Sequence, residues 1–185
     1  MTEPVMVTGL GVVSPFNPDG DLGRFWTALC NGESAVGDIR SFDASAYASH
    51  VAAEVPRGEL REGEAGDEPA IRLAEVVFAR ALHDAGIPRG AGEPRRIGVF
   101  VGTVLGGTTS GERYLRAKAV TDQEAATRLA RSPLWAIPTL LARKAGFAGP
   151  VLTVSTACAS GSAAGFGRRS TVACSTTAMS RLMPG

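Results

Sequence analysis

The segment that decides the fold is VLTVSTACASGSAAG, residues 151–165. Its first half, a short apolar and β-branched run behind Pro150, predicts a fully buried strand. Its second half consists of small residues and predicts a helix. Cys158 lies where the two meet, and the unpaired N–H groups and partial positive charge of a helix N-terminus favour a thiolate over a thiol. The pattern leaves two interpretations of Cys158: a catalytic nucleophile, or a small buried hydrophobic residue.

The exact order of residues in this segment favours a catalytic nucleophile. The run TACASG, residues 156–161, closely resembles the active-site segment of the β-ketoacyl-acyl-carrier-protein synthases, the condensing enzymes of fatty acid and polyketide biosynthesis. The resemblance extends from about Val5 to about Gly167. It implies that Cys158 takes the acyl chain as a thioester. It also implies substrates carried on the phosphopantetheine arm of an acyl carrier protein, with no other cofactor and no metal.

The same resemblance implies a fold class. The chain should be α/β, the N-terminal half of a thiolase-like fold, with a mixed, mostly parallel sheet of five strands and helices on both faces. Residues 5–15, VMVTGLGVVSP, resemble the opening of a condensing enzyme, where they form the first core strand. Members of the family are obligate dimers, homodimeric or heterodimeric, that pair through this half.

Composition limits the function classes. The chain has 185 residues, a net charge of +1 and 44% hydrophobic residues, which suits one α/β domain and gives no reason to expect nucleic acid or an anionic membrane as a partner. No apolar run is long enough for a membrane span, and the N-terminus lacks the pattern of a signal peptide, so we expect a cytoplasmic protein. Three cysteines without a CxxC motif and two distant histidines, His50 and His83, suggest neither a disulfide framework nor a metal site.

Local signals predict the remaining elements. Residues 19–21, Asp-Gly-Asp, supply the N-cap candidates of a helix whose apolar stripe, Leu22 to Leu29, should pack in the core, and Asn31-Gly32 ends it. Residues 51–55 form a short edge strand. A strong helix runs from Pro69 to Gly86 and lies against the sheet. The loop at 57–67 precedes this helix. After the helix come a buried strand at 97–101, a glycine-rich loop at 102–107, a polar helical region at 110–131, and a helix that has Pro138 in its first turn and runs to Gly146.

The resemblance supplies candidates for the acyl pocket. In condensing enzymes a glycine-rich loop near the pocket follows the strand at this position, which makes Val104, Leu105 and Thr108 candidate substrate-binding residues. A flexible loop without a ligand is the alternative. Trp135 and Ile137 precede the nucleophile strand in a region that commonly lies near the pocket and the dimer interface. For these two residues, packing in the core is an equal alternative.

The resemblance stops after Gly167. We therefore divide the chain into a ketosynthase half, residues 1–167, and an atypical tail, residues 168–185. The tail is rich in Ser and Thr, has no period of 2 or 3.6, and is explained by a shifted reading frame, an altered end or disorder. It replaces the strand through which the family dimerises, so the last strand and dimerisation are both in doubt.

The family's second half brings two histidines for the decarboxylation step and a lysine–glutamate pair. Neither His50 nor His83 lies at a matching position. The predicted function is thus acyl transfer to Cys158 followed by decarboxylative condensation with a malonyl carrier protein, by a truncated chain that cannot complete the reaction alone. The alternative is a non-catalytic partner or an inert remnant of a ketosynthase. The look-alike partners of heterodimeric systems lack the cysteine, so Cys158 argues against the first of these.

Overall fold

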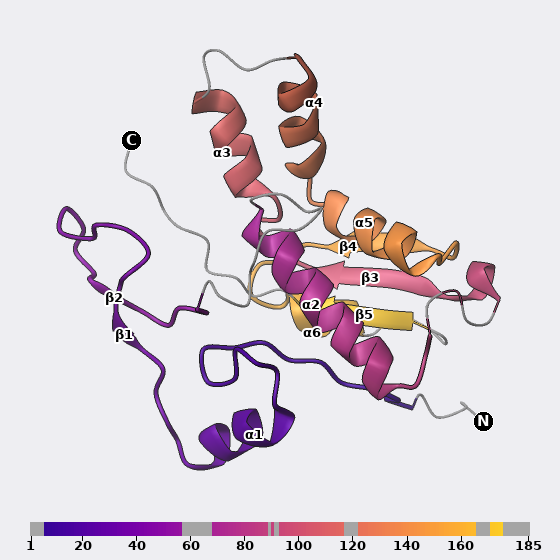
Figure 1. The fold of residues 1–185 in the computed structure, drawn as a ribbon, viewed down its shortest axis with the longest axis horizontal. Coiled ribbons are helices and arrows are strands. Elements are labelled where there is room, and N and C mark those ends of the chain that lie inside the picture. Colours follow the sequence, from indigo (N-terminus) through magenta and orange to yellow (C-terminus); the bar gives the residue numbers. More distant parts are fainter. Residues whose placement is uncertain are drawn as a thin grey trace.

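A parallel sheet of three strands forms the centre of the fold (Figure 1). This computed structural model describes residues 6–56, 68–88, 90, 93–116, 122–165 and 171–175. The middle strand, β3 (Gly98–Gly102), pairs with β4 (Val151–Val154) on one side and with β5 (Thr171–Ser175) on the other. All three strands point the same way, so their carboxyl ends lie at one edge of the sheet.

Helices lie on both faces of this sheet. α2 (Pro69–Asp84) and α5 (Ala136–Ala145) cover the face to which Val99 and Val101 of β3 point, and both valines have no exposed surface. Alternate residues of a strand point to opposite faces. Gly102 therefore faces the other side, where α6 (Ser160–Gly165) begins against it. The predicted helix ends are confirmed, since Gly86 and Gly146 follow α2 and α5 with left-handed φ values of +66° and +74°.

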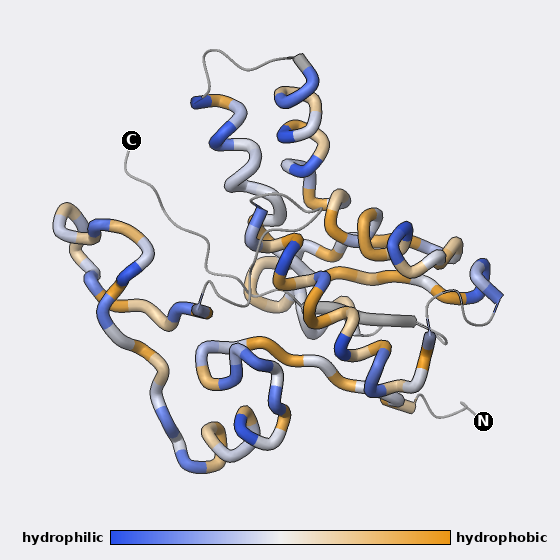
Figure 2. The backbone as a smooth tube through the Cα atoms, viewed as in Figure 1, coloured by the Kyte–Doolittle hydropathy of each residue, from blue (hydrophilic) through white to orange (hydrophobic). Residues whose placement is uncertain are grey.

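The hydrophobic core lies between α2, α5 and β3, and Figure 2 shows β3 as hydrophobic along most of its length. The rings of Phe78 and Phe147 meet edge to face with centroids 6.2 Å apart. At the border of the core, Lys144 Nζ of α5 lies 2.7 Å from a carboxylate oxygen of Glu75 in α2. The buried cluster comprises Ala70, Ile71, Ala74, Phe78, Leu82, Val99, Val101, Ile137, Leu141, Ala142, Ala145 and Phe147.

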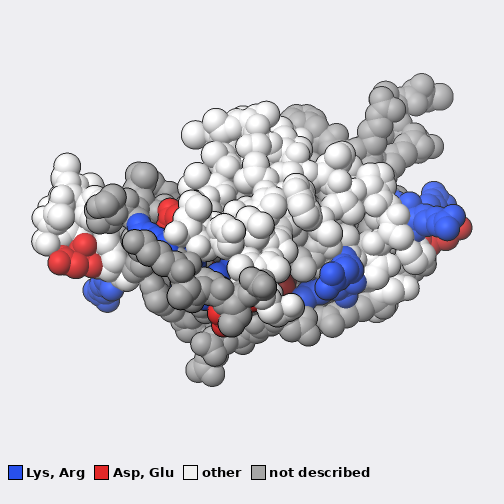
Figure 3. Space-filling model, turned by 90° about the horizontal axis from the view of Figure 1, so that it is seen from above, with Lys and Arg blue, Asp and Glu red and all other residues white. Residues whose placement is uncertain are grey.

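The polar region predicted as helical forms two helices. α3 (Thr108–Arg116) and α4 (Asp122–Arg131) pack against each other and project above the sheet in Figure 1. A single turn of 3-10 helix, η2 (Pro94–Arg96), leads into β3. Seen from above, the charged groups of the described surface lie in separate clusters with uncharged surface between them (Figure 3). No helix in the described ranges is long and apolar enough to cross a membrane.

The predicted first core strand is not a strand. Residues 6–14 run as extended coil beside α2, and Met6 and Val7 are mostly exposed. The glycines of this segment let the backbones approach closely, because a Cβ on Gly11 would lie 2.3 Å from the carbonyl oxygen of Val77. The Leu10 N–H donates to the Asp84 carboxylate at 2.8 Å. A helix surface has no free row of N–H and C=O groups, so a segment lying on it cannot form the ladder of a strand.

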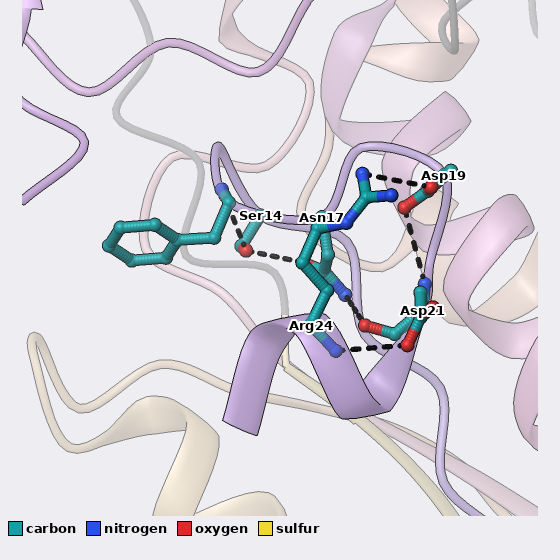
Figure 4. A network of polar contacts seen from close by, with 6 residues as sticks. Ser14, Asn17, Asp19, Asp21 and Arg24 are labelled. Carbon is teal, nitrogen blue, oxygen red and sulfur yellow. Dashed lines mark hydrogen bonds and ion pairs between the residues drawn. The ribbon is translucent and has the colours of Figure 1, made fainter. Parts of the chain in front are cut away.

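The loop before the first helix is held by a polar network (Figure 4). Asn17 is fully buried; its amide donates to the Asp21 carbonyl at 3.1 Å and accepts from the Ser14 hydroxyl. Of the predicted cap candidates, Asp21 caps α1 (Leu22–Cys30), and its side chain accepts from the Arg24 N–H at 2.9 Å. The predicted core stripe of α1 is wrong, because Trp26 is 67% exposed and α1 lies apart from the sheet in Figure 1.

Three further predictions about strands need correction. The antiparallel pair β1 (Gly37–Asp38) and β2 (Val51–Ala52) forms a separate small sheet, so the edge strand predicted at residues 51–55 exists but is shorter. The described main sheet has three strands rather than the five that the resemblance implies. Among the described strands β4 lies at the edge of the sheet with Val151 and Leu152 exposed, so it is not the fully buried strand that was predicted. β5 lies within the tail, residues 168–185, where the sequence shows no alternation of apolar and polar residues.

Candidate active site

The candidate site lies at the carboxyl edge of the sheet, where β3 and β4 end side by side. Gly102 and Val154, the last residues of the two strands, are register partners. The Thr103 N–H continues this pairing by donating to the Val154 carbonyl at 3.1 Å. The loop after β3 and the turn after β4 therefore leave the sheet at the same edge. In open α/β sheets, this is the edge at which ligands bind.

Cys158 stands in the turn between β4 and α6. Two hydrogen bonds close this turn: the Ala159 N–H donates to the Thr156 carbonyl at 3.2 Å, and the Ser160 N–H to the Ala157 carbonyl at 3.1 Å. Ala157 has a left-handed φ of 51°, an uncommon conformation for a residue with a Cβ. The thiol residue itself is exposed, so the interpretation of Cys158 as a buried hydrophobic residue is wrong. α6 begins at Ser160, two residues later than a helix starting at the cysteine would.

The sequence did not single out Ser160 beyond its small size. The residue is 3% exposed, and its hydroxyl accepts from the Thr156 N–H at 2.9 Å and donates to the Ala157 carbonyl at 2.6 Å. Both bonds bridge back across Cys158 to the two residues that precede it. A serine in a first helical turn commonly bonds to nearby backbone in this way, and that was the signal available in the sequence.

The candidate pocket residues of the glycine-rich loop lie at the same edge. Val104 and Leu105 follow β3 after one intervening residue, Thr103, and are 47% and 46% exposed. Thr108 opens α3, and its hydroxyl donates to the Leu105 carbonyl. The loop glycines serve packing, because a Cβ on Gly107 would lie 1.8 Å from the Arg131 carbonyl oxygen. The loop therefore packs against the last residue of α4.

The second candidate pair divides between surface and core. Trp135 is 59% exposed, whereas Ile137 has no exposed surface and belongs to the core cluster. Core packing was one of the two roles expected for each. This segment is also tied to the nucleophile strand, because the Thr153 hydroxyl of β4 donates to the Leu134 carbonyl at 3.2 Å. Trp135 therefore follows a residue anchored to β4.

A buried carboxylate near this edge had no signal in the sequence. Glu68 precedes α2 and is only 2% exposed, and its carboxylate accepts from the Ser110 N–H at 2.7 Å. Ser110 lies in the first turn of α3, where backbone N–H groups have no partner within the helix. Burial raises the pKa of Glu68 above 4.5, and the hydrogen bonds from Ser110 and the charge of Arg113 oppose that rise. Glu68 thus joins the starts of α2 and α3.

We predict a pH dependence of stability from Glu68. Between pH 4.5 and the raised pKa, the folded chain holds a proton that the unfolded chain has released. The free energy of unfolding therefore falls as pH rises through this window. Urea unfolding at several values from pH 4.5 to 7.5 should show this slope, and Glu68→Gln should remove it while keeping an oxygen for the Ser110 N–H. An equal slope in the two proteins would contradict the assignment.

The described residues offer no metal site at this edge or elsewhere: no group of three or more His, Cys, Asp or Glu side chains comes together among them. Both histidines are exposed on other elements, His50 just before β2 and His83 in the last turn of α2. A shallow cavity lies away from the carboxyl edge, between the N-terminal segment and α2. It is lined by Leu10, Gly20, Leu22, Ala79, Arg80, His83 and Asp84.

Comparison with known proteins gives consistent matches. Residues 2–168 match the family model described as the N-terminal domain of beta-ketoacyl synthase. The ketoacyl synthase alpha subunit of the tetracenomycin polyketide synthase from Streptomyces glaucescens is 35% identical over 181 residues, which cover 88% of this chain and 41% of that protein. The chloroplastic 3-oxoacyl-[acyl-carrier-protein] synthase I of Hordeum vulgare is 32% identical over 187 residues, with 85% and 37% covered.

Among solved structures, the ishigamide ketosynthase/chain length factor superposes with a TM-score of 0.69 at 26% identity, over 84% of this chain and 40% of that chain. The chain thus spans about two fifths of the length of the relatives that it matches.

Proposed function

The chain belongs to the beta-ketoacyl synthase family, matching its N-terminal domain, and on that basis we propose that Cys158 accepts an acyl group as a thioester. One observation supports this most: Cys158 is exposed in a closed turn at the carboxyl edge of the sheet, beside the end of β3. The turn holds the residue before the cysteine in a left-handed conformation, with φ of 51° at Ala157. Strained backbone that the surrounding structure maintains is typical of functional sites.

In the proposed first stage, the Cys158 thiolate attacks the carbonyl carbon of an acyl thioester on the phosphopantetheine arm of an acyl carrier protein. A new bond forms between that carbon and Sγ. The bond from the carbon to the pantetheine sulfur breaks, and the released thiolate takes up the proton that Cys158 lost. The negative charge that develops on the carbonyl oxygen requires backbone N–H donors, each typically contributing about a hundred- to a thousand-fold in rate.

In the second stage, a malonyl thioester loses carbon dioxide and its carbanion attacks the acyl-enzyme, forming a β-ketoacyl chain and freeing Cys158. This stage needs groups that stabilise the carbanion, which the family resemblance places in two histidines beyond this half. His50 and His83 lie on elements other than the turn and loop of the carboxyl edge. We therefore propose that these 185 residues accept an acyl group but do not condense it.

The test is a two-step incubation followed by intact-protein mass spectrometry. The chain is first incubated with an acyl thioester of N-acetylcysteamine and should gain the mass of one acyl group. Malonyl thioester is then added, and neither carbon dioxide release nor loss of the adduct as a β-ketoacyl product should follow. Turnover of the malonyl thioester would contradict the second part of the proposal, and absence of any adduct would contradict the first.

Exposed apolar side chains support a second proposed function, which is association of this chain with another protein chain. Leu152 of β4 is 50% exposed, Trp135 is 59% exposed, and Leu115 of α3 is 80% exposed. Of these, Leu152 belongs to an edge strand of the described sheet, and such a strand is a template with which another chain can pair. The partners that we propose are an acyl carrier protein and a second ketosynthase chain, in the cytoplasm. A chain that forms no acyl adduct but co-purifies with such a partner would be a non-catalytic subunit, and one that does neither would be an inert remnant.

A further inference from the structure

We propose that Ser160 is a positioning residue for Cys158, an inference that rests on the acyl-acceptor function proposed above. The Ser160 hydroxyl makes two hydrogen bonds at once, accepting from the Thr156 N–H and donating to the Ala157 carbonyl. These two residues directly precede Cys158. The hydroxyl therefore fixes the backbone from which the cysteine side chain projects.

Burial separates this role from contact with substrate. Ser160 is 3% exposed, whereas Cys158 is exposed. An acyl donor approaching the thiol from solvent therefore meets Cys158 and not the serine hydroxyl. The hydroxyl acts only through the conformation of the turn.

The turn needs such support because Ala157 occupies a conformation that a residue with a Cβ rarely adopts. A strained residue of this kind persists only where its surroundings hold it in place. The Ser160 hydroxyl holds the Ala157 carbonyl at 2.6 Å, and the Ser160 N–H lies 3.1 Å from the same oxygen. Both donors of Ser160 thus converge on the strained residue.

Gly102, the last residue of β3, supports the turn by close contact with the start of α6. An added Cβ at Gly102 would lie 2.2 Å from the Ser160 carbonyl oxygen, so the start of α6 rests directly on the last residue of β3. β3 is the central strand of the sheet. The start of α6 therefore connects the cysteine turn to the central strand of the described sheet.

The experiment compares two reactions of the same thiol. Rates of Cys158 acylation by octanoyl-N-acetylcysteamine and of alkylation by iodoacetamide are measured by peptide mass mapping, with the exposed Cys30 as internal reference. The variants are Ser160→Ala, Ser160→Thr as the rescue, and Ser162→Ala as a matched control at an exposed serine of the same helix. Hydrogen exchange at the Thr156 amide reports the turn directly.

For Ser160→Ala we expect acylation to slow by about ten-fold or more, because acyl transfer depends on the orientation of the attacking atom. Alkylation of Cys158 relative to Cys30 should change little, since a small reagent reaches an exposed thiol from many directions. Thr156 exchange should speed up, Ser160→Thr should restore both properties, and Ser162→Ala should match the natural chain. If Ser160→Ala does not fold, hydrogen exchange at the Thr156 amide of the natural chain decides: a protected amide supports the hydrogen bond to Ser160, and an unprotected one overturns it.

Acylation and Thr156 exchange that are unchanged in Ser160→Ala, or an equal loss in Ser162→Ala, would overturn the inference. A natural chain whose Cys158 is alkylated but never acylated would instead contradict the proposed function. In that case the exchange measurement still decides the role of Ser160 in the turn: faster Thr156 exchange supports it, and unchanged exchange overturns it.

Discussion

Replacement of Cys158 by alanine is expected to abolish the acyl adduct. The adduct requires a sulfur nucleophile at this position, and the rest of the turn offers no thiol. Because Cys158 is exposed, the substitution removes little packing and should change the free energy of unfolding by no more than about 0.5 kcal/mol. Loss of the adduct in a chain of unchanged stability would therefore report chemistry and not folding. Intact-protein mass spectrometry after incubation with an acyl thioester measures the adduct, and urea unfolding measures the stability.

Cys30→Ala provides the matched control, because Cys30 is also exposed but ends α1, far along the chain from the carboxyl edge. This variant should gain one acyl group as fully as the natural chain. Cys174→Ala tests the remaining cysteine, which lies in β5. An adduct that survives in Cys158→Ala, or equal labelling of Cys30 and Cys158, would mean that the turn confers no special reactivity.

Gly102→Ala is expected to damage both stability and the site. The new Cβ would lie 2.2 Å from the Ser160 carbonyl oxygen, 2.5 Å from its carbon and 2.7 Å from the Gly161 nitrogen. All three are backbone atoms, so no side chain can rotate away and α6 has to move. Overpacking of this kind typically costs about 1–3 kcal/mol and occasionally more. We expect a loss of about 3 kcal/mol in urea unfolding and slower acylation of Cys158 in the fraction that folds.

The matched control is Gly165→Ala at the other end of α6. A Cβ there meets open space, and alanine favours a helix more than glycine does. This variant should keep the natural acylation rate and lose no stability. If Gly102→Ala were as stable and as reactive as Gly165→Ala, the close contact between β3 and α6 would not govern the site.

Much of the local structure could be predicted because its causes are local. Asp21 caps α1 with its own side chain, and the glycines after α2 and α5 take the left-handed conformation that ends a helix. The position of Cys158 between a strand and a helix followed from the change of period within a few residues. In each case the decisive atoms belong to residues near one another in the chain.

The errors concern what each segment packs against. Residues 6–14 have the composition of a strand, but a strand requires a partner strand, and this segment lies on α2 instead. β4 looked fully buried because its residues are apolar, although its place at the edge of the sheet leaves Leu152 half exposed. Composition does not determine either outcome, because both depend on residues far away in the chain.

The site shows the same division. The cysteine was evident from its motif, whereas Ser160 acts through two backbone groups that become neighbours only once the turn has closed. Glu68 gave no signal, because its partner, the Ser110 N–H, lies 42 residues further along the chain. A carboxylate just before Pro69 is typical of a solvated loop, and this one is buried because the starts of α2 and α3 come together in the folded chain.

The order β4-β3-β5 has a consequence for how the chain folds during synthesis. β3 is synthesised before both of its partner strands: Val99 pairs with Val151, 52 residues later, and with Val172, 73 residues later. At about 5–20 residues per second, the first pairing is delayed by several seconds after β3 appears. Throughout that interval the apolar side chains of α2 and β3 are not yet covered by a complete sheet. Contacts between residues far apart in the chain also form slowly. The nascent chain is therefore exposed to aggregation between the synthesis of β3 and that of β4.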